Sequence, residues 1–247
     1  MRTLRLAAVL TAGALALSAC GNSANKDGKD TSASSAQVKI VATTTQICDY
    51  VTQIATDTSP NATLTLNKTD PAGKKTTVGA AEDKAKSTIN LTCLLAPNAS
   101  AHEHEMTPAQ SKALANADLM LVSGVDLEHF LDDAVKSTGF KGIMGVTSGI
   151  LSSKDVDDIT KVKEAETSLP YKVDRGITKV NIAKWPFPPE QGESEPEFRF
   201  DPHVWTSPRN ASFQVRNIGS FLDKASPANK GLFDIACIGL LQDHRRP

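Results

Sequence analysis

Two histidines separated by a single residue are candidate metal ligands. They lie in the polar run His102-Glu103-His104-Glu105. Neutral imidazole is the commonest protein ligand for zinc, and it also binds manganese, iron and copper. In an extended backbone the side chains of His102 and His104 point to the same side, so the two imidazoles could clamp one ion. The alternative interpretation is an exposed polar loop that binds nothing.

A second candidate lies much later in the chain, in the run Asp201-Pro202-His203-Val204-Trp205. Pro202 restricts the backbone that leads into His203, and Trp205 could pack beneath the imidazole and exclude water. The carboxylate of Asp201 could accept the other ring N–H of His203 and so fix its tautomer. The alternative interpretation is a half-buried histidine beside a core tryptophan.

Alternating apolar segments place the first of these clusters at the end of a strand. Short runs of β-branched and apolar residues predict four strands, over residues 37–42, 89–95, 119–122 and 142–146. Helical patterns lie between them. This order predicts an α/β fold with a parallel four-stranded sheet and helices on both faces. Such sheets bind ligands at the carboxyl ends of their strands, where the loop that carries His102 begins.

Spacing, capping residues and composition assign the remaining segments. Helices are predicted over residues 45–56, from Thr107-Pro108, from Pro208 to near Ser226, and from Ala228. Polar or charged composition predicts a long irregular connection, with a small hairpin, over residues 57–88 and loops over 152–170 and 186–202. A second hairpin is predicted over 172–184. We expect His129 to be exposed on a helix, and His244 lies in the terminal tail.

Taken together, the two histidine clusters resemble one family, the cluster A-I (zinc/manganese) substrate-binding proteins of ABC transporters. The resemblance covers about residues 37–230 and keeps the order of the family's motifs. The matching segments are Ala42–Thr45, Pro97–Ala99 followed by Ser100–Pro108, Asn116–Glu128, Asp201–Trp205 and Ser207–Ala211.

This resemblance implies a metal ion bound between two lobes that a long helix joins. It assigns His102 and His203 as ligands from the N-terminal lobe, with Asp201 and Trp205 supporting His203. His104 falls where the family has an aromatic or polar residue, so it either supports a ligand or binds the metal itself. The family's other ligands come from a second lobe. We expect that lobe to be missing, because residues 227–247 begin as a linker helix and end in a sequence atypical of the family.

The N-terminus is similar to a bacterial lipoprotein signal. Basic residues precede the short apolar run 6–17, which ends in Leu17-Ser18-Ala19-Cys20. We therefore predict a signal peptide over 1–19, lipid on Cys20, a flexible tether over 20–36 and the metal-binding lobe over 37–226. The alternative is an ordinary cleaved signal with an incidental cysteine. These features predict a lipid-anchored protein at the outer face of the cell membrane.

Three further cysteines lie beyond Cys20. An exported protein meets an oxidising compartment, so a disulfide between Cys48 and Cys93 is plausible, and two buried thiols are the alternative. Cys237 lies near the end of the chain, and no pair of cysteines has the short spacing of a structural zinc site. The net charge of −1 and the few aromatic residues give no support to nucleic-acid binding.

These observations favour a solute-binding protein that captures a divalent metal and delivers it to an ABC permease, acting as a monomer and not as an enzyme. Zn²⁺ is favoured over Mn²⁺ because the visible candidates are nitrogen donors. One alternative is a truncated surface protein, either an adhesin or an inactive copy. Another is a zinc hydrolase in which Glu103 or Glu105 acts as the general base.

Overall fold

A seven-stranded sheet organises the residues that the computed structural model describes, which are 36–81 and 83–243. The strands pair in the order β3-β2-β4-β1-β5-β6-β7. All neighbours are parallel except β2 and β3. The strands are β1 (Ala36–Ala42), β2 (Leu64–Thr69), β3 (Lys75–Gly79), β4 (Ser87–Cys93), β5 (Leu119–Val122), β6 (Ile143–Val146) and β7 (Lys172–Asp174). The predicted signal peptide, Cys20, nearly all of the tether and His244 lie outside the described residues.

The prediction of a parallel sheet is confirmed, but the predicted number of four strands is wrong. The four expected strands are β1, β4, β5 and β6, and three more extend the sheet at its two edges. β2 and β3 form a hairpin that is mostly polar, with only Leu64 and Leu66 as buried aliphatic side chains. β7 has three residues, none of them fully buried. Strands near the edge of a sheet, with one face exposed to solvent, lack the continuous apolar run that marks a strand buried on both faces.

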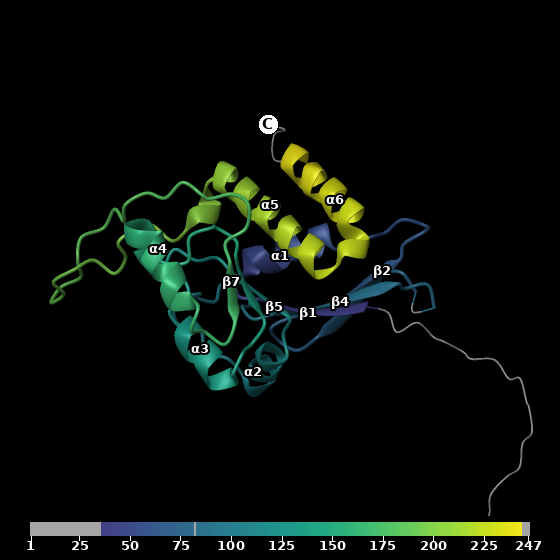
Figure 1. The fold of residues 1–247 in the computed structure, drawn as a ribbon, viewed down its shortest axis with the longest axis horizontal. Coiled ribbons are helices and arrows are strands. Elements are labelled where there is room, and N and C mark those ends of the chain that lie inside the picture. The colour runs from purple at the N-terminus through teal and green to yellow at the C-terminus, as the bar shows by residue number, and fades with distance from the viewer. Residues whose placement is uncertain (1–35, 82, 244–247) are drawn as a thin grey trace, which may run out of the picture. The chain divides into compact units, whose positions relative to one another are not determined.

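Helices cover both faces of this sheet, as predicted. Figure 1 shows α1, α5 and α6 on one side and α2 and α3 on the other. The helices are α1 (Thr45–Ile54), α2 (Pro108–Ala115), α3 (Leu131–Thr138), α4 (Lys154–Glu166), α5 (Pro208–Ala225) and α6 (Lys230–Asp243). Capping residues set the starts of several helices. Thr107, for example, forms a reciprocal capping box with Gln110 ahead of the proline that opens α2.

The pleat of the central strands divides their side chains between two cores. In β5, Leu119 and Leu121 join the core under α1, α5 and α6, while Met120 and Val122 join the core over α2 and α3. β1 alternates in the same way, since Ile40 faces the first core and Val41 the second. Burial on both faces explains why these strands are recognisable as apolar runs in the sequence.

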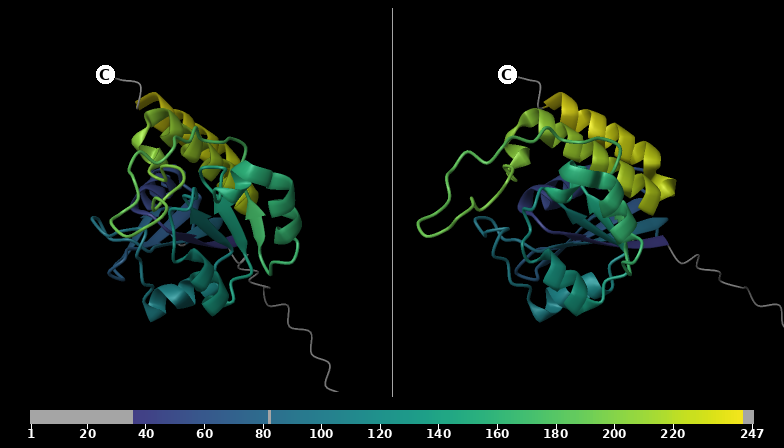
Figure 2. Two further views of the ribbon diagram at one scale, coloured as in Figure 1. Left: turned by 90° about the vertical axis from the view of Figure 1, so that its left-hand side faces the viewer. Right: turned by 60° about the vertical axis from the view of Figure 1, so that its left-hand side comes forward.

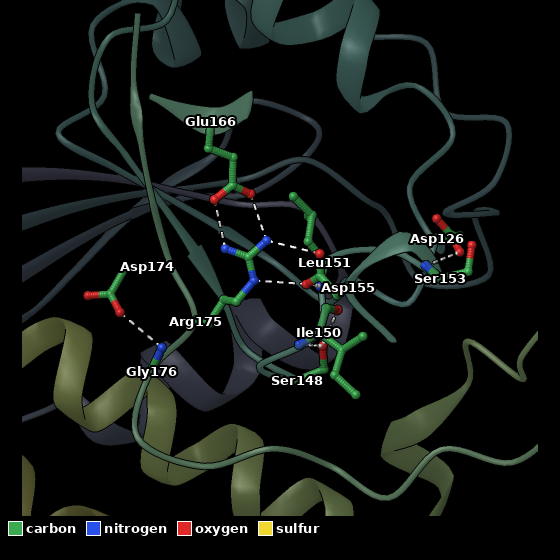
Figure 3. Close-up of polar contacts among 10 residues, drawn as sticks. All are labelled: Asp126, Ser148, Ile150, Leu151, Ser153, Asp155, Glu166, Asp174, Arg175 and Gly176. Carbon is green, nitrogen blue, oxygen red and sulfur yellow. Dashed lines mark hydrogen bonds and ion pairs between the residues drawn. The ribbon is translucent and has the colours of Figure 1, made fainter. Parts of the chain in front are cut away.

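Residues 152–170 are not the predicted loop, because most of them form α4. This helix has a single buried residue, Asp155, so it has no apolar stripe to reveal it. Its anchor is Arg175, which follows β7 and donates hydrogen bonds to the carboxylates of Asp155 and Glu166 (Figure 3). Asp155 also accepts the backbone N–H of Leu151. A contact between segments distant in the sequence therefore stabilises a helix that its own pattern does not predict.

The hairpin predicted over 172–184 is also absent from the structure. Only β7 is a strand there, and it pairs in parallel with β6. The chain then runs to an isolated antiparallel bridge between Lys184 and Phe200. Between these two residues a proline- and glutamate-rich loop projects away from the sheet (Figure 2). The bridge closes the base of this loop and brings its two ends together.

Two links fix the helices above the sheet. Cys48 of α1 and Cys93 at the end of β4 form a disulfide, the pairing that the sequence suggested. α6 packs against α1 and α5 through Phe233 and Cys237, the latter a buried free thiol. Burial raises the pKa of Cys237 to about 11, so this thiol stays protonated near neutral pH.

We expect loss of the disulfide to lower the free energy of unfolding. The bond closes a loop of sequence separation 45. Loops of that size lose about 2–4 kcal/mol of stability when the bond is removed. Urea unfolding of the double variant Cys48→Ser and Cys93→Ser, beside the parent chain with and without reductant, measures this loss. Free thiols located at Cys48 and Cys93 in the untreated protein by mass spectrometry would contradict the assignment.

Loss of Arg175 should destabilise the protein far more than loss of an exposed arginine. The side chains of Arg175, Asp155 and Glu166 are only 10%, 3% and 16% exposed. Arg175→Met therefore leaves two carboxylates without their cationic partner. We expect it to lower the free energy of unfolding by about 3–5 kcal/mol. The matched control is Arg199→Met, because Arg199 pairs with Asp157 at 53% and 54% exposure, and it should cost less than ~1 kcal/mol. Equal losses in urea unfolding would refute this role of Arg175.

Candidate metal centre

The two histidine clusters meet at the carboxyl edge of the sheet, beside the point where the strand order reverses between β1 and β5. A cavity of about 250 Å³ lies there, lined by both His102 and His203. Its walls come from the segments that follow β1, β4 and β5, together with Trp205. The fold therefore brings together two residues that are far apart in the sequence.

The ring of His102 is oriented by a backbone carbonyl. Its Nδ1 lies 3.0 Å from the carbonyl oxygen of Leu127. Since a carbonyl can only accept, Nδ1 carries the proton and Nε2 keeps its lone pair. Burial lowers the pKa of His102, and the hydrogen bond to Leu127 opposes part of that shift. The imidazole is thus held in the neutral tautomer that can bind a metal through Nε2.

The ring of His203 is oriented in the same way by a carboxylate. Its Nδ1 lies 2.8 Å from Oδ1 of Asp201, which also accepts the backbone N–H of His203 at 3.0 Å. Trp205 presents its ring edge-on to the imidazole at 5.4 Å between centroids. Asp201 makes the hydrogen bond considered from the sequence, but Trp205 does not pack beneath the ring; Trp185 is the tryptophan that stacks with it, at 6.0 Å between centroids. No hydrogen bond between described residues uses Nε2 of His203. The centroids of His102 and His203 are 5.4 Å apart.

The carbonyl that orients His102 follows a turn of unusual backbone conformation. Gly124, Val125 and Asp126 all have positive φ, at 85°, 57° and 58°. A β-branched residue such as Val125 rarely adopts this conformation, which stores strain unless its surroundings enforce it. Here the backbone N–H of Val125 donates to Ile150, and the carboxylate of Asp126 accepts the N–H of Ser153. These contacts hold the turn just before Leu127.

A buried carboxylate completes that support. Glu128 accepts hydrogen bonds from the hydroxyl of Thr43 at 2.7 Å and from the N–H groups of Ser123 at 2.6 Å and Gly124 at 3.1 Å. Burial raises the pKa of Glu128, and these three donors oppose the shift. No role was predicted for Glu128 beyond its place in a family motif, because its partners come together only in the folded chain.

His104 does not share the surroundings of His102. Residues 101–103 bend instead of staying extended, so the two side chains diverge. The ring of His104 packs edge-on against Phe130 at 5.2 Å, and its Nε2 is buried without a hydrogen-bond partner in the structure. Burial lowers the pKa of His104. The assignment of His104 as a ligand stays a prediction, and the ring that contacts His203 is that of His102.

His129 is exposed, as expected, but it lies in the turn before α3 and not on a helix. Its ring centroid is 5.7 Å from that of His102 and 5.3 Å from that of Phe198. Phe198 also contacts His102 and Trp185, so aromatic rings from the base of the projecting loop border the site. Within residues 36–81 and 83–243, no three His, Cys, Asp or Glu side chains are already arranged to hold a metal ion.

Comparison with known proteins points to one family. The sequence profile of the family described as "Zinc-uptake complex component A periplasmic" (ZnuA) matches residues 40–236. A curated relative, the metal ABC transporter substrate-binding lipoprotein ScbA of Streptococcus cristatus, is 25% identical over 146 residues. That match covers 59% of this chain but only 38% of the relative.

Solved structures are also similar to this chain. A zinc-bound deletion mutant of ZnuA superposes with a TM-score of 0.50 at 14% identity, covering 86% of this chain and 55% of the other. The metal-dependent lipoprotein YcdH of Bacillus subtilis gives 0.48 at 17% identity, covering 85% and 52%. This chain thus spans about half the length of these proteins.

The family match covers most of the chain, and it agrees with the motifs that carried the resemblance. Family members are metal-binding transport components, which confirms that the chain is not an enzyme. The chain belongs to the family of periplasmic zinc-uptake complex component A (ZnuA) proteins.

Proposed function

We propose that this protein captures a divalent transition-metal ion outside the cell membrane, through His102 and His203, for delivery to an ABC permease. The observation that carries this proposal is the matched orientation of the two imidazoles. Each ring donates its Nδ1–H to a fixed oxygen, at 3.0 Å for His102 and 2.8 Å for His203. Each therefore keeps Nε2 free as a metal donor.

The separation of the rings suits a shared ion. Zinc–nitrogen bonds are about 2.0–2.1 Å long, and two imidazoles on a tetrahedral ion have ring centroids about 5 Å apart. The observed separation of 5.4 Å is close to that value. Small side-chain adjustments would bring both Nε2 atoms onto one ion.

The donor set favours Zn²⁺ over Mn²⁺. Imidazole nitrogen suits zinc, while manganese prefers sites rich in carboxylate and water oxygen. Asp201 is engaged with Nδ1 of His203, so its role here is to orient that ring rather than to bind the metal. The metal is the cargo of such a protein and takes part in no bond-breaking step.

A lipid on Cys20 would keep the protein beside its transporter. The curated relative is named as a lipoprotein and as a substrate-binding component of an ABC transporter. In the part of the chain that the structure describes, no helix is long and apolar enough to cross a membrane. On the lipoprotein-like N-terminus and the name of that relative, we propose a monomer held at the extracytoplasmic face by its lipid, with the permease as its partner.

A second candidate is a surface protein or inactive copy that does not transport metal. The observation that favours it is the donor set, because no three His, Cys, Asp or Glu side chains of residues 36–81 and 83–243 are arranged to hold a metal ion. Two imidazoles leave a zinc ion with open coordination positions, and such a site binds weakly if nothing else contributes. Metal titration separates the two candidates.

We expect the full chain, with Cys20→Ser to prevent lipidation, to bind Zn²⁺ with an affinity on the order of micromolar or tighter. His102→Ala and His203→Ala should each abolish the binding heat, because each removes one of the two free Nε2 donors. Isothermal titration calorimetry with Zn²⁺ and with Mn²⁺ tests this, and circular dichroism checks that each variant folds. No binding by the parent chain would favour the non-transporting candidate.

Asp201→Asn should weaken metal binding without removing a ligand. The amide no longer offers a carboxylate to the Nδ1–H of His203, so the imidazole loses its fixed orientation and some basicity. Changes of this kind lower metal affinity by about 10–100-fold. Asp174→Asn is the control. Asp174 lies away from the site, where it pairs with Lys224 and accepts the backbone N–H of Gly176. Equal affinities for Asp201→Asn and the parent would rule out this role.

A further inference from the structure

The turn that orients the first proposed ligand is bonded to the segment that precedes α4. The backbone N–H of Val125 donates to the carbonyl of Ile150 at 2.9 Å, and the N–H of Asp126 donates to the carbonyl of Leu151 at 3.2 Å. The carboxylate of Asp126 then accepts the backbone N–H of Ser153 at 2.8 Å (Figure 3). This third bond is made by a side chain, so a substitution can remove it and leave the two backbone bonds possible.

The backbone of this turn needs such contacts because it is held in the left-handed conformation. Val125 and Asp126 have φ angles of 57° and 58°. For residues other than glycine this conformation is strained and persists only where the surroundings enforce it. The carbonyl of Leu127 comes directly after these residues and lies 3.0 Å from Nδ1 of His102. Relaxation of the turn would move this carbonyl, because the backbone angles before it set its direction.

The segment that holds the turn is itself fixed by buried charges. The carboxylate of Asp155 accepts the backbone N–H of Leu151 at 2.7 Å and two N–H groups of Arg175 at 2.8 and 3.0 Å (Figure 3). The side chains of Asp155 and Arg175 are only 3% and 10% exposed. A fully bonded polar network of this kind is rigid. Ser153 is therefore held in place without the help of Asp126, so the bond between them acts on the turn.

This support reaches His102 and not His203. Nδ1 of His203 donates to the carboxylate of Asp201 in its own segment, and that bond involves no residue of the turn. Without the carbonyl of Leu127, His102 would also populate the tautomer that carries the proton on Nε2, the nitrogen that a metal needs. The two imidazoles should therefore respond differently when the turn is released.

We propose that Asp126 is a positioning residue of the metal site. Its bond to Ser153 holds the left-handed turn, the turn fixes the carbonyl of Leu127, and that carbonyl keeps the proton of His102 on Nδ1. The role needs no contact between Asp126 and the ion. The consequence for metal affinity rests on the proposed function, whereas the effect on the tautomer of His102 does not.

The test compares Asp126→Gly with Asp126→Asn in the full chain carrying Cys20→Ser. Glycine adopts a positive φ readily, so Asp126→Gly removes the carboxylate without adding strain. Asparagine also tolerates this conformation, and it keeps an oxygen that can accept the N–H of Ser153. Asn98→Gly is the matched control, since Asn98 is an exposed residue with a φ of 68° in the segment that leads to His102.

Nitrogen NMR spectra of the isotope-labelled, metal-free chain distinguish protonated from unprotonated ring nitrogens at a pH where imidazole is neutral. We expect Asp126→Gly to lose the single Nδ1–H tautomer at His102 and to keep it at His203. Asp126→Asn and Asn98→Gly should keep it at both. Zn²⁺ titration of the same variants should show an affinity lower by about tenfold or more for Asp126→Gly alone, as for other groups that support a ligand.

Three results would overturn the proposal. One is a parent-like tautomer at His102 in Asp126→Gly. Another is an equal change at His203, in Asp126→Asn or in Asn98→Gly, which would show a general loosening of the site. The third is a changed tautomer with a parent-like Zn²⁺ affinity. Failure of the parent chain to bind Zn²⁺ is a separate outcome, because it refutes the proposed function while the tautomer of His102 still decides the role of Asp126.

Discussion

The site depends on one buried carboxylate at the point where the strand order reverses. Glu128 gathers the hydroxyl of Thr43, which follows β1, and the N–H groups of Ser123 and Gly124, which follow β5. Its removal would leave buried donors without partners, at a cost of about 1–3 kcal/mol for each group. The same contacts hold the left-handed turn whose Leu127 carbonyl orients His102. The buried carboxylate thus determines the tautomer of a proposed ligand that it does not touch.

The second proposed ligand is fixed by a different element, α5. Ser207 caps this helix directly after the 3-10 turn Val204–Thr206 that follows His203. Further along α5, the buried amide of Asn217 donates to the carbonyls of Thr147 and Thr178, and Gln214 donates to the hydroxyl of Thr147. These bonds tie α5 to the segments that follow β6 and β7. The two ligands are therefore held by separate parts of the fold, so their separation is set by how α5 packs on the sheet.

The sequence predicted the parts of this arrangement whose cause is local. β5, with all four residues buried, is a visible apolar run, and Thr107-Pro108 is a local capping signal. The small hairpin expected within 57–88 is β2 and β3, but its pairing with β4 in the main sheet was not predicted. α4 was missed because its stability comes from partners elsewhere, as Arg175 shows. At the site, residue types and motifs pointed to His102, His203 and Asp201. The Leu127 carbonyl and the role of Glu128 depend on tertiary contacts that no local spacing encodes.

The central claim is that Nε2 of His102 and Nε2 of His203 bind the same metal ion. A crystal structure of the zinc-loaded chain, with anomalous data recorded at the zinc absorption edge, tests it most directly. We expect one strong anomalous peak about 2.0–2.1 Å from both Nε2 atoms, with both Nδ1 bonds retained. A peak bound through Nδ1, or a zinc ion at any place that excludes either histidine, would contradict it.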